Sequence, residues 1–275
     1  MIPLIQKTFA EQGRELSFLK YSTPTSGHSP MDKVLFFGFE PNKKYPSVVV
    51  KSVRDPRGGE AIVHGFEKLQ RLCAMVAGTP LERLFAQPIC FYDGESVWSA
   101  ESACLGERRR LSEKDLALVI RDYTAFQVRV ALSPLRDIDS LSSAILSSDK
   151  HLTDVYQALP TSNLQVPHVP QLGDLTPDNI LFSNNGVSIV DCDYLDTVDM
   201  PGFDLVTFLA RIDRKHAKAL CDARLPAYLR AIGAVSEGPL DRLYFLAFVA
   251  ERRLRKQQLG SSRELTEAYA SLFAQ

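Results

Sequence analysis

One segment, which reads as a β-hairpin preceded by a polar loop, constrains the fold more than any other part of the chain. The loop at residues 172–179 has the sequence Leu-Gly-Asp-Leu-Thr-Pro-Asp-Asn, and an apolar run follows at 180–182. Asn-Asn-Gly at 184–186 then separates this run from a second apolar run at 187–190. Asn-Gly between two apolar runs is a strong hairpin signal. We therefore expect two paired strands, with Asp191 directly after the second.

Polar side chains gather at one end of this predicted hairpin. Asn179 stands at the start of the first strand, Asp191 at the end of the second, and Asp174 in the loop just before. Hard oxygen ligands of this kind suit Mg²⁺, and a carboxylate beside the metal suits orienting a hydroxyl nucleophile. The alternative is a surface hairpin whose Asp and Asn residues only form turns. The apolar flanks argue against it, because unpaired carboxylates next to buried strands are costly.

The two motifs resemble a known signature. Leu-Gly-Asp-x-x-x-x-Asn at 172–179 and Val-Asp-Cys-Asp at 190–193 are similar to the His-Gly-Asp-x-x-x-x-Asn and Ile-Asp-x-Asp/Glu motifs of aminoglycoside phosphotransferases and choline kinase-like small-molecule kinases. Leu172 stands where that family has His. The histidine usually supports the loop and is not the proton acceptor, so the reacting groups are retained.

The resemblance implies a role for each polar residue and a fold for the chain. Asp174 would accept or orient the hydroxyl proton, Asn179 and Asp191 would bind Mg²⁺, and Asp193 would contribute to a second metal ion. The nucleotide would be ATP or another nucleoside triphosphate. The implied fold is α+β and protein-kinase-like, with a small antiparallel-sheet lobe that carries one main helix and a larger, mostly helical lobe.

The N-terminal third begins with a predicted amphipathic helix at residues 3–12 and two strands, 16–21 and 34–39. Between the strands lies a loop of small residues at 22–30. Under the resemblance this loop would fold over the nucleotide phosphates. It lacks the Gly-x-Gly-x-x-Gly spacing, and on sequence alone a plain surface hairpin loop is favoured.

A lysine lies inside the β-branched run at residues 47–53. Lys51 must point to a cleft or to solvent, because burying an unpaired ammonium group is costly. Glu60 then opens a helix with helically spaced apolar residues. Under the resemblance, Lys51 would hold the nucleotide phosphates and Glu67 would hold Lys51, with Glu60 as the runner-up. The alternative is an edge-strand lysine and a solvated helix glutamate.

Two further predicted strands, at residues 87–92 and 96–101, complete a five-stranded lobe. The segment 101–106 then reads as a linker between lobes. The resemblance implies that the backbone here, at Glu101 and Ala103, hydrogen-bonds the adenine base.

We place the nucleotide-binding lobe at residues 1–102 and the catalytic and substrate-binding helical lobe at 103–275. Ser112 and Asp115 form a plausible capping box for a helix that runs to about residue 132. Asp204 resembles the aspartate of the family's Pro-x-x-Asp-Leu segment, which braces the catalytic loop by accepting backbone hydrogens. Further helices are predicted at 140–159, 213–232, 238–258 and 262–273.

Composition excludes several classes of function. The apolar content of 45% and charged content of 24% over 275 residues are typical of a soluble two-lobed protein. The net charge of −1 does not mark a nucleic-acid binder. No apolar run spans a membrane and no signal peptide is recognisable, which predicts a cytoplasmic protein without a membrane partner. The five cysteines are scattered and odd in number, which favours buried free thiols in a reducing compartment.

The sequence therefore predicts ATP- and Mg²⁺-dependent transfer of a γ-phosphoryl group to a hydroxyl of a small molecule. The alternative is a nucleotide-binding pseudokinase that acts as a scaffold or regulator. A protein kinase is less favoured, because the segment 193–204 is too short for a long activation loop. Residues 201–275 contain 12 Lys+Arg and 8 Asp+Glu, a balance that does not favour a cationic acceptor. The sequence indicates neither the acceptor's identity nor the oligomeric state.

Overall fold

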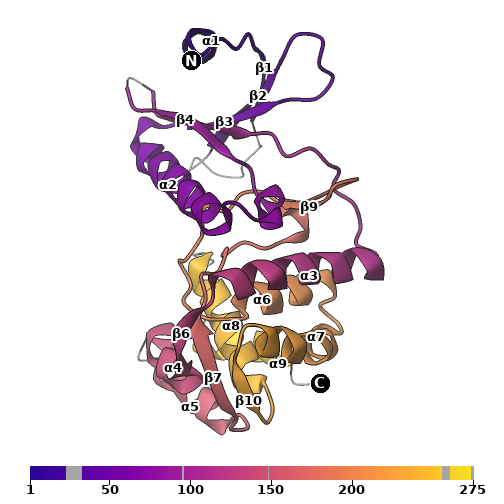
Figure 1. The fold of residues 1–275 in the computed structure, drawn as a ribbon. Helices are drawn as coiled ribbons and strands as arrows, with labels where there is room; N and C mark the ends of the chain where they lie inside the picture. The colour runs from indigo at the N-terminus through magenta and orange to yellow at the C-terminus, as the bar shows by residue number, and fades with distance from the viewer. Residues whose placement is uncertain (23–32, 95, 148, 256–260, 274–275) are drawn as a thin grey trace. The chain divides into compact units, whose positions relative to one another are not determined.

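The chain folds into two compact units (Figure 1). The computed structural model describes residues 1–22, 33–94, 96–147, 149–255 and 261–273. The first unit contains residues 1–107 and 181–193, and the second contains 108–180 and 194–275. This division differs from the predicted one in that the hairpin segment 181–193 belongs to the first unit. The loop predicted to cover the phosphates lies, beyond Ser22, outside the described residues.

The first unit is built on a five-stranded antiparallel sheet, as predicted, with the strand order β1-β2-β3-β5-β4. Helix α1 (Ile2–Glu11) precedes the sheet, and helix α2 (Gly59–Val76) follows its third strand. The strands are β1 (Ser17–Ser22), β2 (Lys33–Phe39), β3 (Val48–Val53), β4 (Pro88–Tyr92) and β5 (Trp98–Ser102).

The two faces of this sheet differ in polarity. Val50 of β3 lies opposite Phe36 of β2 and Ala100 of β5, and all three are buried in one core with Phe9 of α1. Side chains alternate between faces along a strand, so Lys51 projects from the opposite face. Helix α2 contacts β3, β4 and β5, and its residues line a groove with Lys51. The helix thus covers the face that carries the polar residues.

The hairpin predicted around Asn-Asn-Gly is present. Strands β8 (Ile180–Ser183) and β9 (Gly186–Ile189) form a two-stranded sheet. A short 3₁₀ helix, Pro177–Asn179, precedes β8. The apolar side chains Ile180, Phe182 and Ile189 are buried. The hairpin therefore leads from Asn179 in the second unit to Asp191 in the first.

The second unit is mostly helical. Ser112 accepts the backbone N–H of Asp115, and the Asp115 side chain accepts the backbone N–H of Ser112, so the predicted capping box starts the first helix. The most deeply buried helices are α6 (Phe203–Ile212) and α8 (Asp241–Leu254). The helices are α3 (Glu113–Val130), α4 (Ile138–Leu146), α5 (Lys150–Ala158), α6 (Phe203–Ile212), α7 (Ala217–Ala231), α8 (Asp241–Leu254) and α9 (Ser262–Phe273).

Two features of the second unit were not predicted. A three-stranded sheet has the order β10-β7-β6 and is formed by β6 (Leu132–Asp137), β7 (Asn163–His168) and β10 (Val235–Glu237). The single helix predicted over 140–159 is instead the pair α4 and α5, because Ser147 takes a left-handed φ of 49° and ends α4. Among the described residues, no helix is long and apolar enough to cross a bilayer.

Candidate functional site

Three charged side chains share the α2-covered face of the first unit's sheet. Lys51 lies opposite Leu35 in β2 and Ser99 in β5. Lys33 lies two residues before Leu35 in β2, and Glu101 lies two residues after Ser99 in β5. Both side chains therefore project from the same face of the sheet as Lys51. The register of β2, β3 and β5 therefore places a row of Lys33, Lys51 and Glu101 beneath α2.

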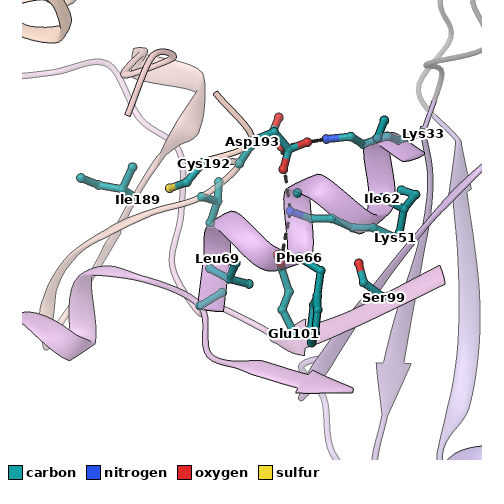
Figure 2. Close-up of a pocket in the computed structure, with 15 residues that line it drawn as sticks. Lys33, Lys51, Ile62, Phe66, Leu69, Ser99, Glu101, Ile189, Cys192 and Asp193 are labelled. Atoms are coloured by element: carbon teal, nitrogen blue, oxygen red, sulfur yellow. Dashed lines mark hydrogen bonds and ion pairs between the residues drawn. The ribbon is translucent and has the colours of Figure 1, made fainter. Parts of the chain in front are cut away.

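Lys51 is the centre of this row. Its Nζ lies 3.1 Å from Glu101 Oε2 and 3.9 Å from Asp191 Oδ1, and Figure 2 shows it pointing toward Glu101. Burial lowers the pKa of the Lys51 ammonium group, but Glu101 and Asp191 outweigh this effect and leave the pKa raised. Lys51 is therefore a charged ammonium group held in a mostly buried place, as a phosphate-binding lysine needs to be.

The predicted partner of Lys51 was wrong. Lys51 pairs with Glu101 of β5, whereas the helix residues Glu67 and Glu60 are both exposed. The groove above Lys51 is lined instead by the apolar and small residues of α2, which include Ile62, Gly65, Phe66 and Leu69. The physical reason is the helical period of 3.6 residues, which turns Glu67 away from the face that Ile62, Phe66 and Leu69 share.

Sequence reasoning missed a second lysine, Lys33. Its Nζ forms an ion pair with Asp193 Oδ2 and lies 3.3 Å from Asp191 Oδ1 (Figure 2). Burial lowers the pKa of Lys33 and the nearby Lys51 adds to this effect, although Asp191 opposes it. The signal that could have found Lys33 is the alternation of side chains between the two faces of β2. Once the register of β2 and β3 is known, this alternation puts Lys33 on the same face as Lys51.

Asp191 and Asp193 follow β9 closely and face these two lysines. Asp191 has a φ of 62°, a left-handed conformation that is uncommon outside glycine and is found at functional sites. Burial raises the pKa of its carboxyl group, but Lys33 and Lys51 outweigh this and hold the pKa below its usual value. Asp193 lies against α2, where a Cβ on Gly65 would come within 3.1 Å of its Oδ1. The two carboxylates are thus fixed beside the lysine row.

The groove formed by these residues has about 20 Å³ of free space. That volume suits about one water molecule. Among the described residues, no group of three or more His, Cys, Asp or Glu side chains is placed to hold a metal ion. The carboxylates that line this groove are Asp191, Asp193 and Glu101, and Lys33 and Lys51 form ion pairs with them.

The segment after β5 was predicted to contact adenine through Glu101 and Ala103. The side chain of Glu101 is engaged by Lys51, and the Ala103 N–H donates to the carbonyl oxygen of Ser47 at 3.0 Å. The adenine contact stays a prediction, and that N–H is already used within the first unit.

In the second unit, Asp174 and Asn179 lie together. The Asn179 Nδ2 donates to the Asp174 carboxylate Oδ2 and to its backbone carbonyl oxygen, both at 3.0 Å. The 3₁₀ turn at Pro177–Asn179 brings the two residues together. Because the amide nitrogen makes both bonds, the amide oxygen of Asn179 is the atom that remains for a cation.

Asp204 braces the loop at residues 172–174, as the resemblance implied. Its carboxylate accepts the backbone N–H of Leu172 at 2.6 Å, the backbone N–H of Gly173 at 2.8 Å and the hydroxyl of Tyr123 at 2.9 Å. Burial raises the pKa of Asp204 to about 6, although the three hydrogen bonds oppose it. Asp204 is fully buried, so these bonds fix the loop that leads to Asp174.

The two residues before Asp174 are also fixed by packing. Leu172 is 1% exposed, so its apolar side chain turns inward. Gly173 has a φ of 82°, and a Cβ at this position would come within 2.5 Å of the Tyr194 Cβ. A side chain at residue 173 is therefore excluded by both conformation and space.

Two arginines that the sequence did not connect with Asp174 contact it. Arg255, just after α8, hydrogen-bonds the Asp174 Oδ1, and Arg211 of α6 lies 3.7 Å from the same oxygen. Both arginines also pair with Glu251 of α8. No local sequence signal could have found them, because they reach Asp174 through helix packing.

The fold is protein-kinase-like and α+β, with a small antiparallel-sheet unit and a helical unit. Residues 113–265 match the phosphotransferase enzyme family (APH). The chain belongs to this family, since the match covers more than half of its length. No curated protein matches the chain significantly.

Several solved structures with similar folds are antibiotic phosphotransferases. An aminoglycoside 2'-phosphotransferase-IIIa in its GDP complex has a TM-score of 0.57 and 15% identity, over 99% of this chain and 98% of that one. A thermostable mutant of APH(4)-Ia in a ternary complex with ADP and hygromycin B has a TM-score of 0.59 and 11% identity, over 98% and 96%. The apoenzyme of macrolide 2'-phosphotransferase MphH from Brachybacterium faecium has a TM-score of 0.57 and 14% identity, over 98% and 97%.

Proposed function

We propose that the protein transfers the γ-phosphoryl group of ATP, or of another nucleoside triphosphate, to a hydroxyl group of a small molecule with the help of Mg²⁺. Its membership of the phosphotransferase family supports the reaction class. The nucleotide and small-molecule ligands of similar folds support the kinds of substrate. The observation that carries the proposal is the Asp174 carboxylate, which is bonded to Asn179 in a loop braced by Asp204.

Each residue has a proposed role. Asp174 would orient the acceptor hydroxyl and take its proton as the oxygen attacks the γ-phosphorus. Lys51, held by Glu101, would bind the nucleotide phosphates. Catalysis would then rest on positioning and on charge neutralisation.

The residues present fit Mg²⁺ chemically. Asp191 and Asp193 offer carboxylate oxygens and Asn179 an amide oxygen, which are the donors this ion prefers. In the first unit the ammonium group of Lys33 forms ion pairs with both carboxylates, so a bound ion would compete with Lys33 for them. When bound, Mg²⁺ neutralises charge on the nucleotide phosphates.

The test is Mg²⁺-dependent ADP release by the purified protein with a panel of hydroxyl acceptors. Asp174→Asn should lower turnover at least about 100-fold and keep nucleotide affinity, because its carboxylate acts on the nucleophile. Asp178→Asn, at an exposed residue of the same loop, is the matched control and should behave as wild type. Equal turnover by Asp174→Asn and wild type would overturn the role of Asp174.

Asp191→Ala should abolish Mg²⁺-dependent nucleotide binding while the fold, checked by circular dichroism, is kept.

A nucleotide-binding pseudokinase is the second candidate. One observation favours it: the ammonium group of Lys33 lies against both carboxylates that would hold the metal ion. Tight ATP binding without ADP release for any acceptor would support this alternative. Removal of the ammonium group in Lys33→Met would then be expected to raise Mg²⁺ affinity.

A further inference from the structure

A groove rich in arginine lies beside the candidate base in the second unit. It has a volume of about 360 Å³ and is lined by residues of α6, α8 and α9 and by the chain just after α6 and α8. Its charged lining consists of Arg211, Arg214, Glu251, Arg252 and Arg255. The volume is that of a small-molecule site.

Two of these arginines connect the groove to Asp174. Arg255 is hydrogen-bonded to the Asp174 Oδ1, and the Arg211 Nη1 lies 3.7 Å from it. A molecule that enters the groove is therefore within reach of groups that touch the candidate base. This places the groove where an acceptor with a hydroxyl near Asp174 would extend.

The charge of the groove is positive after its internal pairs are counted. The lining carries four arginines and one glutamate, which gives +4 − 1 = +3, or +2 when the adjoining Asp174 is included. Glu251 and Asp174 are shared by Arg211 and Arg255. The lining therefore carries an excess of positive charge, to which Arg214 and Arg252 contribute.

These two arginines are placed to meet a ligand. Arg214 is exposed, and no described residue forms an ion pair with it. The Arg252 guanidinium lies 5.3 Å from the centroid of the Phe248 ring, and Phe248 also lines the groove. Guanidinium groups bind carboxylate and phosphate through paired hydrogen bonds. The groove thus offers an anion site next to a small apolar surface.

We propose that the acceptor of this phosphotransferase is an anionic hydroxyl compound, with a carboxylate or phosphate group that binds Arg214 and Arg252. The inference rests on the proposed phosphotransfer to a hydroxyl. A cationic amino sugar would meet like charge here, which disfavours binding.

The first experiment measures binding without turnover. Wild-type protein is titrated calorimetrically with four three-carbon hydroxyl compounds that differ in charge: glycerol, glycerate, glycerol 3-phosphate and serinol. We expect the two anions to bind more tightly than glycerol, and serinol to bind least. If neither anion binds more tightly than glycerol, the inference is wrong. This result would contradict the anionic acceptor but not the proposed phosphotransfer. A lack of nucleotide-dependent turnover would contradict the phosphotransfer but not the measured binding of the anions.

A charge reversal locates the site. Arg214→Glu should weaken binding of glycerol 3-phosphate by about tenfold or more and strengthen binding of serinol, since the sign of one nearby charge changes. Lys215→Glu makes the same change at the next residue, which is exposed and does not line the groove. It should leave both affinities within about twofold of wild type. Equal effects of the two variants would mean that overall charge, and not the groove, governs binding.

Discussion

The stability of the second unit should depend on the ionisation of Asp204 between pH 5 and 7. This residue is fully buried and accepts hydrogen bonds from the backbone of Leu172 and Gly173. Its pKa is raised by burial to about 6 from an ordinary value of 3.8. The folded state therefore binds a proton in a range where the unfolded state does not. Stability from this group is highest at low pH and is lost as the pH rises through 6.

The size of the effect follows from the two pKa values. Over the whole window from 3.8 to about 6, the linked free energy is about 3 kcal/mol at about 1.36 kcal/mol for each pKa unit. Between pH 7 and pH 5 the change is about 1 kcal/mol. Asp204→Asn has no carboxyl group that titrates at this position. From pH 7 to pH 5 the wild type should therefore gain this free energy of unfolding, and the variant should not. The variant should also be less stable at every pH by about 1–3 kcal/mol, because one buried N–H loses its acceptor.

The assay must report on the second unit. The only tryptophan, Trp98, lies in the first unit, so its fluorescence is unsuitable. Hydrogen exchange of the peptide that contains Leu172 and Gly173 measures local opening directly. Asp178→Asn, which removes an exposed carboxylate of the same loop, should keep the wild-type pH dependence. Parallel profiles of wild type and Asp204→Asn, within about 0.5 kcal/mol, would refute the linkage argument.

Three further changes test other parts of the structure. Leu172→Ala should lower the free energy of unfolding by about 2–5 kcal/mol because it opens a cavity at a buried side chain, and urea denaturation followed by circular dichroism would show no loss if packing there is loose. Lys51→Met should destabilise the first unit by about 3–5 kcal/mol by leaving Glu101 unpaired, and Trp98 fluorescence should show recovery in the double variant with Glu101→Gln. Ser112→Ala should cost about 1 kcal/mol by removing the cap of α3, and an unchanged thermal midpoint would contradict that role.

Local signals were enough to predict the hairpin and the loop before it. Asn-Asn-Gly between apolar runs set the turn, and the strands β8 and β9 correspond to the two apolar runs. The same reasoning gave the five strands of the first unit. Each of these elements depends on residues close in sequence, so neighbouring letters suffice to recognise it. The roles of Asp174, Asn179, Asp191 and Asp193 stay predictions.

The ion pairs of the first unit depend on strand register, which the sequence does not contain. Glu101 meets Lys51 because β5 pairs with β3 in the register that sets Ser99 opposite Lys51. Lys33 reaches Asp191 and Asp193 for a similar reason. A strand shifted by one residue would turn each of these side chains to the other face. The resemblance pointed to a glutamate on the helix, and the sheet supplies one of its own instead.

The arginines beside Asp174 depend on helix packing over still longer separations. Arg252 and Arg255 belong to a basic cluster that is typical of a solvated helix face. The structure instead places both in the groove, because α8 contacts α6 and brings its end to Arg211. Basic residues near a helix C-terminus are common, since they complement the helix dipole. Their sequence pattern therefore does not distinguish a solvated face from a binding groove.

The leucine at residue 172 is compatible with a braced loop before Asp174 because the brace acts on the main chain. Asp204 accepts the N–H groups of Leu172 and Gly173, and any residue except proline supplies such a group. The side chain of Leu172 is then free to contribute packing alone. A histidine there would bring polar nitrogens into a buried place and would need its own partners. The departure from the family signature thus removes a buried polar group together with its requirement for a partner, and leaves the geometry of Asp174 to the backbone and to Asp204.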